Sequence, residues 1–174
     1  EVLAVWRGGM SSHGGFIGVA AALFLWCWFR KIDVRAVADL IVVPAAIGLA
    51  FGRLGNFINQ ELYGTVTALP WGIAFPDVAG LRHPVQLYAM AKDLLIAGLC
   101  LWHLHLRPAR PGRTAALFLI VYGALRFLLE YLRHQDYPLV DFGVLLLSRG
   151  QLLTLPILFL GMLLWEWLAG KQKP

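Results

Sequence analysis

Residues 52–64 read GRLGNFINQELYG and interrupt a chain that is otherwise dominated by leucine and other apolar residues. The stretch follows an apolar run over residues 36–51, and strongly polar side chains at the mouth of a membrane segment are costly unless they serve a purpose. Arg53, Asn56 and Asn59 recur at every third residue, so a helical turn sets them on one face. Asparagine and glycine also end helices ordinarily, so an alternative interpretation of the stretch is a simple helix end.

The composition around this stretch is that of an integral membrane protein. The 174 residues are 59% hydrophobic and 14% charged, with a mean hydropathy of +0.68, whereas a soluble domain carries about a quarter charged residues. The net charge of +5 is therefore interpreted through its distribution along the chain, and no nucleic acid partner is expected. Cys27 and Cys100 lie in apolar runs without CxxC or Cys/His spacing, so no metal site is expected. The opening residues EVLAVWRGGM lack the pattern of a secretory signal peptide.

Five apolar stretches predict an all-α integral membrane protein with about five transmembrane helices, because roughly 17–25 such residues cross a bilayer. They lie at about residues 14–29, 36–51, 84–106, 114–132 and 151–169. Lysine and arginine collect after the first, third and fifth stretches, which the positive-inside rule makes cytoplasmic together with the C-terminus. The chain is thus predicted to be one transmembrane domain, residues 1–174, with a short extracytoplasmic loop of about residues 52–83.

The fourth span carries polar residues on one helical face. Tyr122, Arg126, Glu130 and Arg133 are spaced i, i+4, i+8 and i+11. A charge inside a span costs a few kcal/mol, which pairing of Arg126 with Glu130 reduces. One interpretation is a structural ion pair, with Arg133 reaching the lipid headgroups. The other is that Glu130 orients Arg126 toward an anionic ligand.

Two further segments place histidines on the predicted extracytoplasmic side. Residues 6–19, WRGGMSSHGGFIGV, put His13 among small residues at the start of the first span. This setting suits a proton acceptor or a phosphate donor, and also an ordinary capping residue. Residues 82–88, RHPVQLY, put Arg82 and His83 at a helix N-terminus, which favours anions.

Taken together, these blocks resemble the prolipoprotein diacylglyceryl transferase family of bacterial inner membranes. The match runs in order through RGGMSSHGG, GRLGNFINQELYG, RHPVQLY and YGALRFLLEYLR, and the second block is close to the family signature G-R-x-G-N-F-x-N-x-E. The resemblance implies transfer of the diacylglyceryl group of phosphatidylglycerol to the lipobox cysteine of a prolipoprotein, with formation of a thioether and release of glycerol phosphate. It implies no cofactor and no metal. The implied partners are phosphatidylglycerol, a prolipoprotein lipobox peptide and membrane lipids.

The resemblance also implies which residues carry the function. By motif, the candidate functional residues are His13, Arg53, Asn56, Glu61, Gly64, His83, Arg126 and Glu130. Arg53 and Arg126 are expected to clamp the lipid phosphate, with His13 the first choice and His83 the second choice as the base that takes the thiol proton. Asn59 and Arg133 join the candidate lipid-binding residues because they share faces with Arg53 and Arg126.

The sequence departs from the family pattern in two respects. Ala89 stands where the family usually has the glutamate of its H-P-x-Q-L-Y-E block. The family fold has seven spans, and this chain resembles the last five. Alternative functions are therefore a transporter or anionic-lipid-binding protein without chemistry, or an inactive fragment of the transferase.

Overall fold

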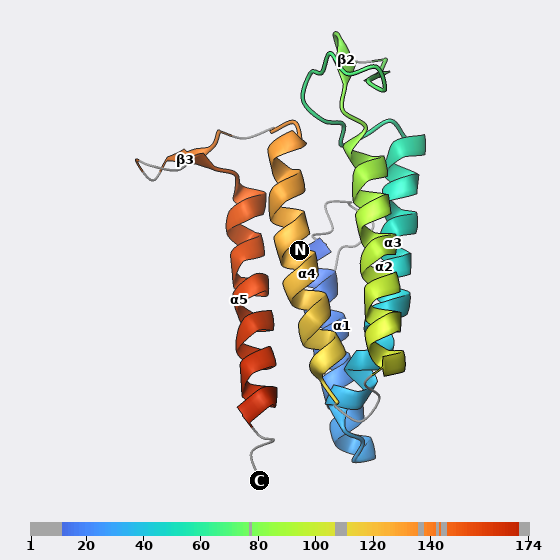
Figure 1. The fold of residues 1–174 in the computed structure, drawn as a ribbon, viewed down its shortest axis with the longest axis vertical. Helices are drawn as coiled ribbons and strands as arrows, with labels where there is room; N and C mark the ends of the chain where they lie inside the picture. The colour runs from blue at the N-terminus through green and yellow to red at the C-terminus, as the bar shows by residue number, and fades with distance from the viewer. Residues whose placement is uncertain are drawn as a thin grey trace, which may run out of the picture. The chain divides into compact units, whose positions relative to one another are not determined.

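The structure is a computed structural model that describes residues 12–76, 78–106, 111–135, 138–141, 143 and 146–170, with only the backbone of residues 12–14, 16 and 17. Within these ranges the chain forms five α-helices and two small β-hairpins (Figure 1). It divides into two compact units, residues 1–37 and 38–174. The predicted helical architecture is confirmed.

The first unit contains helix α1, Ser12–Arg30, and the turn that leads into helix α2, Val34–Ile58. Lys31 adopts a left-handed φ of 55°, and the Ile32 N–H donates to the Cys27 carbonyl at 3.0 Å, which closes the end of α1. Asp33 then accepts the backbone N–H of Arg35 at 3.0 Å and its guanidinium at 2.8 Å. These hydrogen bonds hold the pKa of Asp33 below its ordinary value.

The second unit is a helical bundle in which neighbouring helices alternate in direction. Its further elements are α3 (Val85–Leu106), α4 (Arg113–Leu129), the 3₁₀ turn η2 (Glu130–Leu132) and α5 (Arg149–Gly170). Asp39, near the start of α2, accepts the N–H groups of Gly112 and Ala115 at the start of α4, both at 2.7 Å. Gln151, in the first turn of α5, donates to the Phe127 carbonyl near the end of α4 at 3.4 Å. The helices α2 and α4 therefore begin at one end of the bundle and α5 begins at the other.

Small residues let the helices of this unit approach closely. Ala46 of α2 packs against Ile96, Ala97 and Cys100 of α3, and all four are buried. Between α4 and α5, a Cβ on Gly123 would lie 2.9 Å from the Leu158 Cβ, which is closer than packed atoms allow. Small residues at helix contacts are typical of membrane bundles, where close packing replaces the hydrophobic effect.

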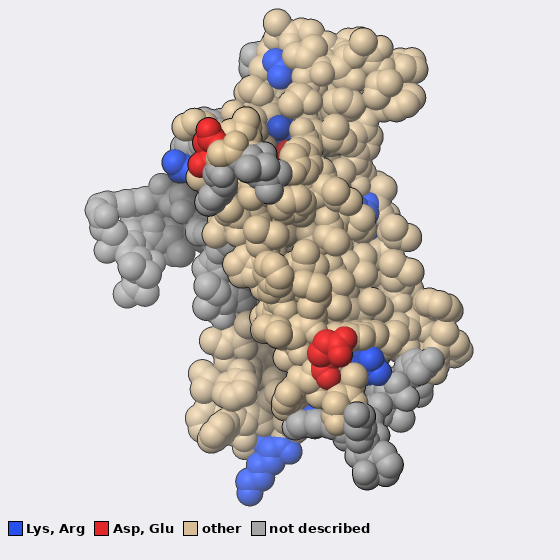
Figure 2. Space-filling model, turned by 60° about the vertical axis from the view of Figure 1, so that its left-hand side comes forward, with Lys and Arg blue, Asp and Glu red and all other residues tan. Residues whose placement is uncertain are grey.

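Among the residues that the structure describes, four helices are long and apolar enough to cross a membrane by length and composition. They are Val34–Ile58, Val85–Leu106, Arg113–Leu132 and Arg149–Gly170, and the shorter apolar segment Gly18–Arg30 lies within α1. Their outward surface carries large apolar side chains that are more than half exposed, among them Leu40, Phe51, Leu101, Trp102 and Leu163. Figure 2 shows a face of the molecule on which charged atoms are sparse. Such a surface matches lipid rather than water.

The connection between α2 and α3 forms a small cap, defined here as residues 59–84. Its hairpin pairs β1 (Ile73–Ala74) with β2 (Leu81–Arg82), and Val66 forms a further bridge to Arg82. The loop was expected from about residue 52, but α2 continues to Ile58, so residues 52–58 are helical. The second hairpin, β3 (Val140–Asp141) with β4 (Leu146–Leu147), precedes α5.

Candidate anion-binding cleft

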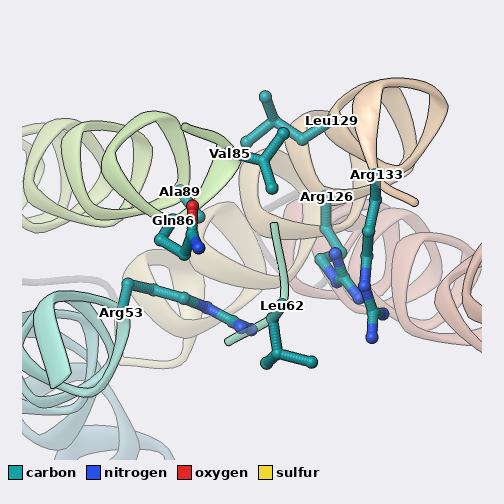
Figure 3. Close-up of a pocket in the computed structure, with 8 residues that line it drawn as sticks. All are labelled: Arg53, Leu62, Val85, Gln86, Ala89, Arg126, Leu129 and Arg133. Carbon is teal, nitrogen blue, oxygen red and sulfur yellow. The ribbon is translucent and has the colours of Figure 1, made fainter. Parts of the chain in front are cut away.

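A cleft lies where the cap meets the ends of α2 and α4 and the start of α3. The empty space at the cleft, counted together with the open solvent at its mouth, amounts to about 330 Å³. Its walls are formed by Arg53, Leu62, Val85, Gln86, Ala89, Arg126, Leu129 and Arg133 (Figure 3). Three arginines from two helices and the segment after η2 therefore share one small space, and no acidic residue lines it among the described residues.

The three arginines differ in how they are held. Arg126 Nη1 lies 2.6 Å from the Glu130 carboxylate, one helical turn away, and Arg133 Nη1 lies 3.4 Å from the same group. Glu130 is 2% exposed, so this carboxylate is a buried partner shared by two cations. Arg53 is half-buried on α2 and has no ion pair or side-chain hydrogen bond within the described part of the chain. The cleft thus has an excess of positive charge, with one guanidinium left for a ligand.

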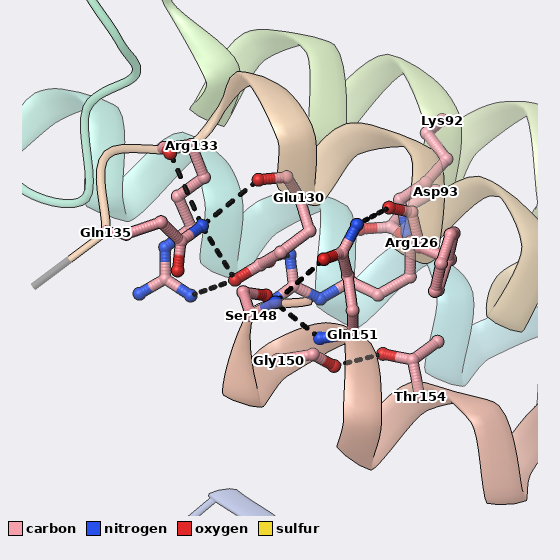
Figure 4. Close-up of polar contacts among 11 residues, drawn as sticks. Lys92, Asp93, Arg126, Glu130, Arg133, Gln135, Ser148, Gly150, Gln151 and Thr154 are labelled. Carbon is pink, nitrogen blue, oxygen red and sulfur yellow. Dashed lines mark hydrogen bonds and ion pairs between the residues drawn. The ribbon is translucent and has the colours of Figure 1, made fainter. Parts of the chain in front are cut away.

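The Glu130 carboxylate is fixed from two further sides (Figure 4). The Gln135 side-chain amide donates to the Glu130 carbonyl at 3.1 Å and to its carboxylate at 3.4 Å. On the α5 side, Gly150 lies so close that a Cβ there would overlap the Glu130 carboxylate. The start of α5 therefore forms a wall against Glu130, and only glycine leaves room for the carboxylate in this position.

Asn56 and Glu61 are connected to the cleft through Gln86. Asn56 donates to the Glu61 carboxylate at 2.7 Å, across the turn that ends α2. The backbone carbonyl of Glu61 accepts the Gln86 side-chain N–H at 2.6 Å. Because Gln86 lines the cleft, this chain of contacts ties the turn after α2 to the first turn of α3. Leu62, the next residue of this turn, lines the cleft with a positive φ of 56°.

A buried ion pair lies one helical turn along α3 from Ala89. Lys92 and Asp93 are 7% and 1% exposed and contact each other directly. The Lys92 ammonium also lies 4.3 Å from the centre of the Tyr122 ring, on the same face of α4 as Arg126. No role was predicted from the sequence for these two charges. Their position inside an apolar span was the signal in the sequence for a polar interior at this level.

The structure brings part of the predicted site together. Arg53, Arg126 and Arg133 meet in the cleft, and the predicted pairing of Arg126 with Glu130 is present. Asn59 lies just beyond the end of α2, where its N–H donates to the Gly55 carbonyl at 2.9 Å, and it is exposed and does not line the cleft. Their roles in binding or catalysis stay predictions.

Two other predicted residues lie in the cap connections rather than on the cleft walls. Gly64 is buried between two backbone segments, where a Cβ would lie 2.7 Å from both the His83 and the Leu132 carbonyl oxygens. The His83 ring nitrogen Nδ1 lies 3.4 Å from the Tyr88 hydroxyl, which accepts the Trp71 indole N–H at 2.7 Å. Gly64 thus has a backbone-packing role in this structure, and His83 belongs to a polar cluster at the base of the cap.

His13 falls at the start of α1, and its side chain lies outside the described residues. Gln86, Gln135 and Gly150 are the contributors that sequence reasoning missed. Gln86 was visible within the RHPVQLY block, but nothing in the spacing separated it from an ordinary residue of a first helical turn. The described residues contain no group of three or more His, Cys, Asp or Glu side chains able to hold a metal ion.

The fold and the cleft define a helical multi-pass membrane protein with an arginine-rich cleft at one end of its bundle. Comparison with known proteins agrees with this class. The family model described as prolipoprotein diacylglyceryl transferase matches residues 1–167, and the chain belongs to this family.

Curated relatives named phosphatidylglycerol–prolipoprotein diacylglyceryl transferase align along the whole chain. The protein of Polynucleobacter necessarius is 44% identical over 173 residues, covering 99% of this chain and 66% of the relative. That of Nitrosospira multiformis is 42% identical over 177 residues, covering 100% and 61%. That of Desulfotalea psychrophila is 42% identical over 180 residues, covering 99% and 66%. The chain therefore spans slightly less than two thirds of the length of these relatives.

Proposed function

We propose that this chain carries the phospholipid site of a transferase that moves the diacylglyceryl group of phosphatidylglycerol to the lipobox cysteine of a prolipoprotein. The observation that carries the proposal is the cleft of three arginines with one shared carboxylate, in a chain whose curated relatives bear this activity in their names. A phosphate diester matches such a cleft because it is a single negative charge with oxygens that accept several N–H donors.

The three arginines of the cleft have different roles in binding the phosphate. Arg53 has no ion pair or side-chain hydrogen bond with any residue that the structure describes, so its guanidinium is available to bind phosphate oxygens without breaking an ion pair. Arg126 is oriented by Glu130 at 2.6 Å, so its remaining N–H groups are held in place before the lipid arrives. Arg133 is the third donor, at a longer distance of 3.4 Å from Glu130. Charge that builds on the departing phosphate is stabilised by donors that need no rearrangement.

The chemistry requires a nucleophile from the substrate. Cys27 and Cys100 are each 1% exposed, so neither is available as a nucleophile. The lipobox thiol gives its proton to a base. Its sulfur then attacks the carbon of the diacylated glycerol that is bonded to the phosphate oxygen. A C–S bond forms, the C–O bond breaks, and the electron pair leaves on the oxygen of glycerol phosphate.

Two histidines are candidates for this base, since imidazole titrates near neutral pH. His13 is the first choice, through its place in the RGGMSSHGG block of the family resemblance. His83 is the second. If its Nδ1 donates to the Tyr88 hydroxyl, its Nε2 is the acceptor.

The proposed setting is the bacterial inner membrane, with the cleft toward the periplasm and the C-terminus in the cytoplasm. The distribution of basic residues along the sequence supports it, because lysine and arginine follow the first, third and fifth apolar stretches. Membrane lipids surround the apolar helices, and a prolipoprotein lipobox peptide is the second substrate.

One assay tests the proposed activity directly. The purified chain is mixed with phosphatidylglycerol vesicles and a lipobox peptide, and mass spectrometry follows the cysteine while glycerol phosphate is measured in solution. The proposal expects a diacylglyceryl mass shift on the cysteine with an equal amount of glycerol phosphate. Binding of phosphatidylglycerol without a mass shift would favour the lipid-binding or fragment alternatives, and flux of the lipid without bond cleavage would favour a transporter.

A further inference from the structure

The Gln86 side chain is the least explained polar group of the cleft. It lies in the first turn of α3, is 2% exposed and lines the cleft between Arg53 and Ala89 (Figure 3). Its Nε2 donates to the Glu61 carbonyl at 2.6 Å, whereas its Oε1 is buried with no hydrogen-bond partner among the described residues. Buried amide oxygens are normally paired, and each exception requires an explanation.

The orientation of this amide is determined by its neighbour. The Glu61 carbonyl oxygen only accepts, so the Gln86 group that faces it must be the NH₂. The Oε1 atom is consequently turned away from Glu61, and it is buried without a partner in a side chain that lines the cleft. The other polar side chains of the cleft walls are the guanidinium groups of Arg53, Arg126 and Arg133, which only donate, so Gln86 Oε1 is the side-chain acceptor of these walls. The cleft thus presents donors for an anion together with one acceptor, and that acceptor suits a hydroxyl group.

We propose that Gln86 is a specificity-determining residue, whose Oε1 accepts a hydrogen bond from a hydroxyl of the lipid headgroup while the arginines bind its phosphate. This inference rests on the proposed function, because it takes phosphatidylglycerol as the ligand. Phosphatidylglycerol combines both features, since its headgroup glycerol carries two free hydroxyls beside the phosphate diester. Ala89, three residues further on α3, has a small side chain that leaves space next to Gln86.

The test compares two lipids that differ only in the headgroup hydroxyls. Phosphatidylpropanol has the same phosphate diester and negative charge as phosphatidylglycerol, but it lacks both hydroxyls. Each lipid competes with an acyl-labelled fluorescent phosphatidylglycerol for the full chain in detergent, and the readout is the ratio of the two affinities. One neutral hydrogen bond predicts a preference for phosphatidylglycerol of roughly two- to thirteenfold.

Variants then assign the preference to Gln86. Gln86→Met removes the acceptor and is expected to bring the affinity ratio to about one, because any structural loss weakens both lipids equally and cancels in the ratio. Gln151→Met is the matched control, since Gln151 is also a buried glutamine but does not line the cleft and its Oε1 already accepts the Ser148 N–H at 2.8 Å. This control is expected to keep the ratio of the unmodified chain.

The outcomes separate this inference from the proposed function. Equal binding of the two lipids by the unmodified chain, or an unchanged preference in Gln86→Met, would overturn the role of Gln86 and leave the phosphate site standing. Binding of neither anionic lipid would overturn both. Because the first comparison needs no substitution, the inference remains testable even if Gln86→Met does not fold.

Discussion

Replacing Arg53 by glutamine should separate ligand binding from stability. Arg53 is half-buried in the cleft and has no ion pair within the described residues, so the folded chain loses no partner when its charge is removed. The free energy of unfolding is therefore expected to change by no more than about 0.5 kcal/mol. A hydrogen bond to a charged group contributes about 1.5–3 kcal/mol, so the affinity for phosphatidylglycerol should fall roughly 10- to 150-fold.

Glu130→Gln, unlike Arg53→Gln, is expected to lower the free energy of unfolding strongly. The substitution leaves Arg126 and Arg133 without their shared carboxylate, and removing one partner of a buried ion pair costs about 3–5 kcal/mol. The arginines are 21% and 28% exposed, so water relieves part of the loss and a value of about 3 kcal/mol is expected. For Arg53→Gln and Glu130→Gln alike, thermal unfolding in detergent measures stability and the fluorescent lipid competition measures the affinity for phosphatidylglycerol.

The control for a simple change in net charge is Arg35→Gln. Arg35 pairs with the exposed Asp33, lies eighteen residues before Arg53 in the sequence and does not line the cleft. It should leave both stability and affinity nearly unchanged, because exposed ion pairs contribute little. The reasoning is refuted if Arg53→Gln unfolds as easily as Glu130→Gln, or if it binds phosphatidylglycerol as tightly as the unmodified chain.

Three further substitutions test how the cleft is supported. Gly150→Ala should lower the free energy of unfolding by about 1–3 kcal/mol and weaken lipid binding, since the new methyl displaces the Glu130 carboxylate; unchanged binding would contradict this. Gly123→Ala should lower the free energy of unfolding by a similar amount, because its methyl meets the backbone of α5, but it should have no specific effect on lipid binding. Gly98→Ala is the control, since a methyl there meets nothing within 4 Å. Asp39→Ala should lower the melting temperature by removing the acceptor of two backbone amides at the start of α4, with a loss of about 0.5–2 kcal/mol; an Asp39→Ala chain as stable as the original would show that these amides find another partner.

Sequence alone predicted the features that are set by local patterns, namely long apolar runs and residue spacings within one helix. Hydropathy located the helices, because each needs a long apolar run whatever it packs against. The pairing of Arg126 with Glu130 followed from a separation of four residues, which one helical turn fixes locally. That Arg53 joins them came from the predicted topology and the family resemblance rather than from any local rule.

What sequence reasoning did not reach depends on contacts between distant segments. The loop after α2 was placed too early because the apolar run stops at Phe51, yet the helix continues through polar residues to Ile58. Gly150 contacts Glu130, which is twenty residues earlier in the sequence. The Gln86 side chain of α3 donates to the Glu61 carbonyl in the turn after α2. Neither contact has a spacing signature, since both are set by where α3 and α5 dock.

The bond between Asp39 and the start of α4 has a consequence for how the protein is assembled during synthesis. Asp39 belongs to α2, which leaves the ribosome well before α4, and its carboxylate is 5% exposed in the finished fold. An ionised carboxylate without partners is costly inside a bilayer. Both donors belong to the start of α4, so Asp39 gains these partners only after residues 112–115 have been synthesised and docked.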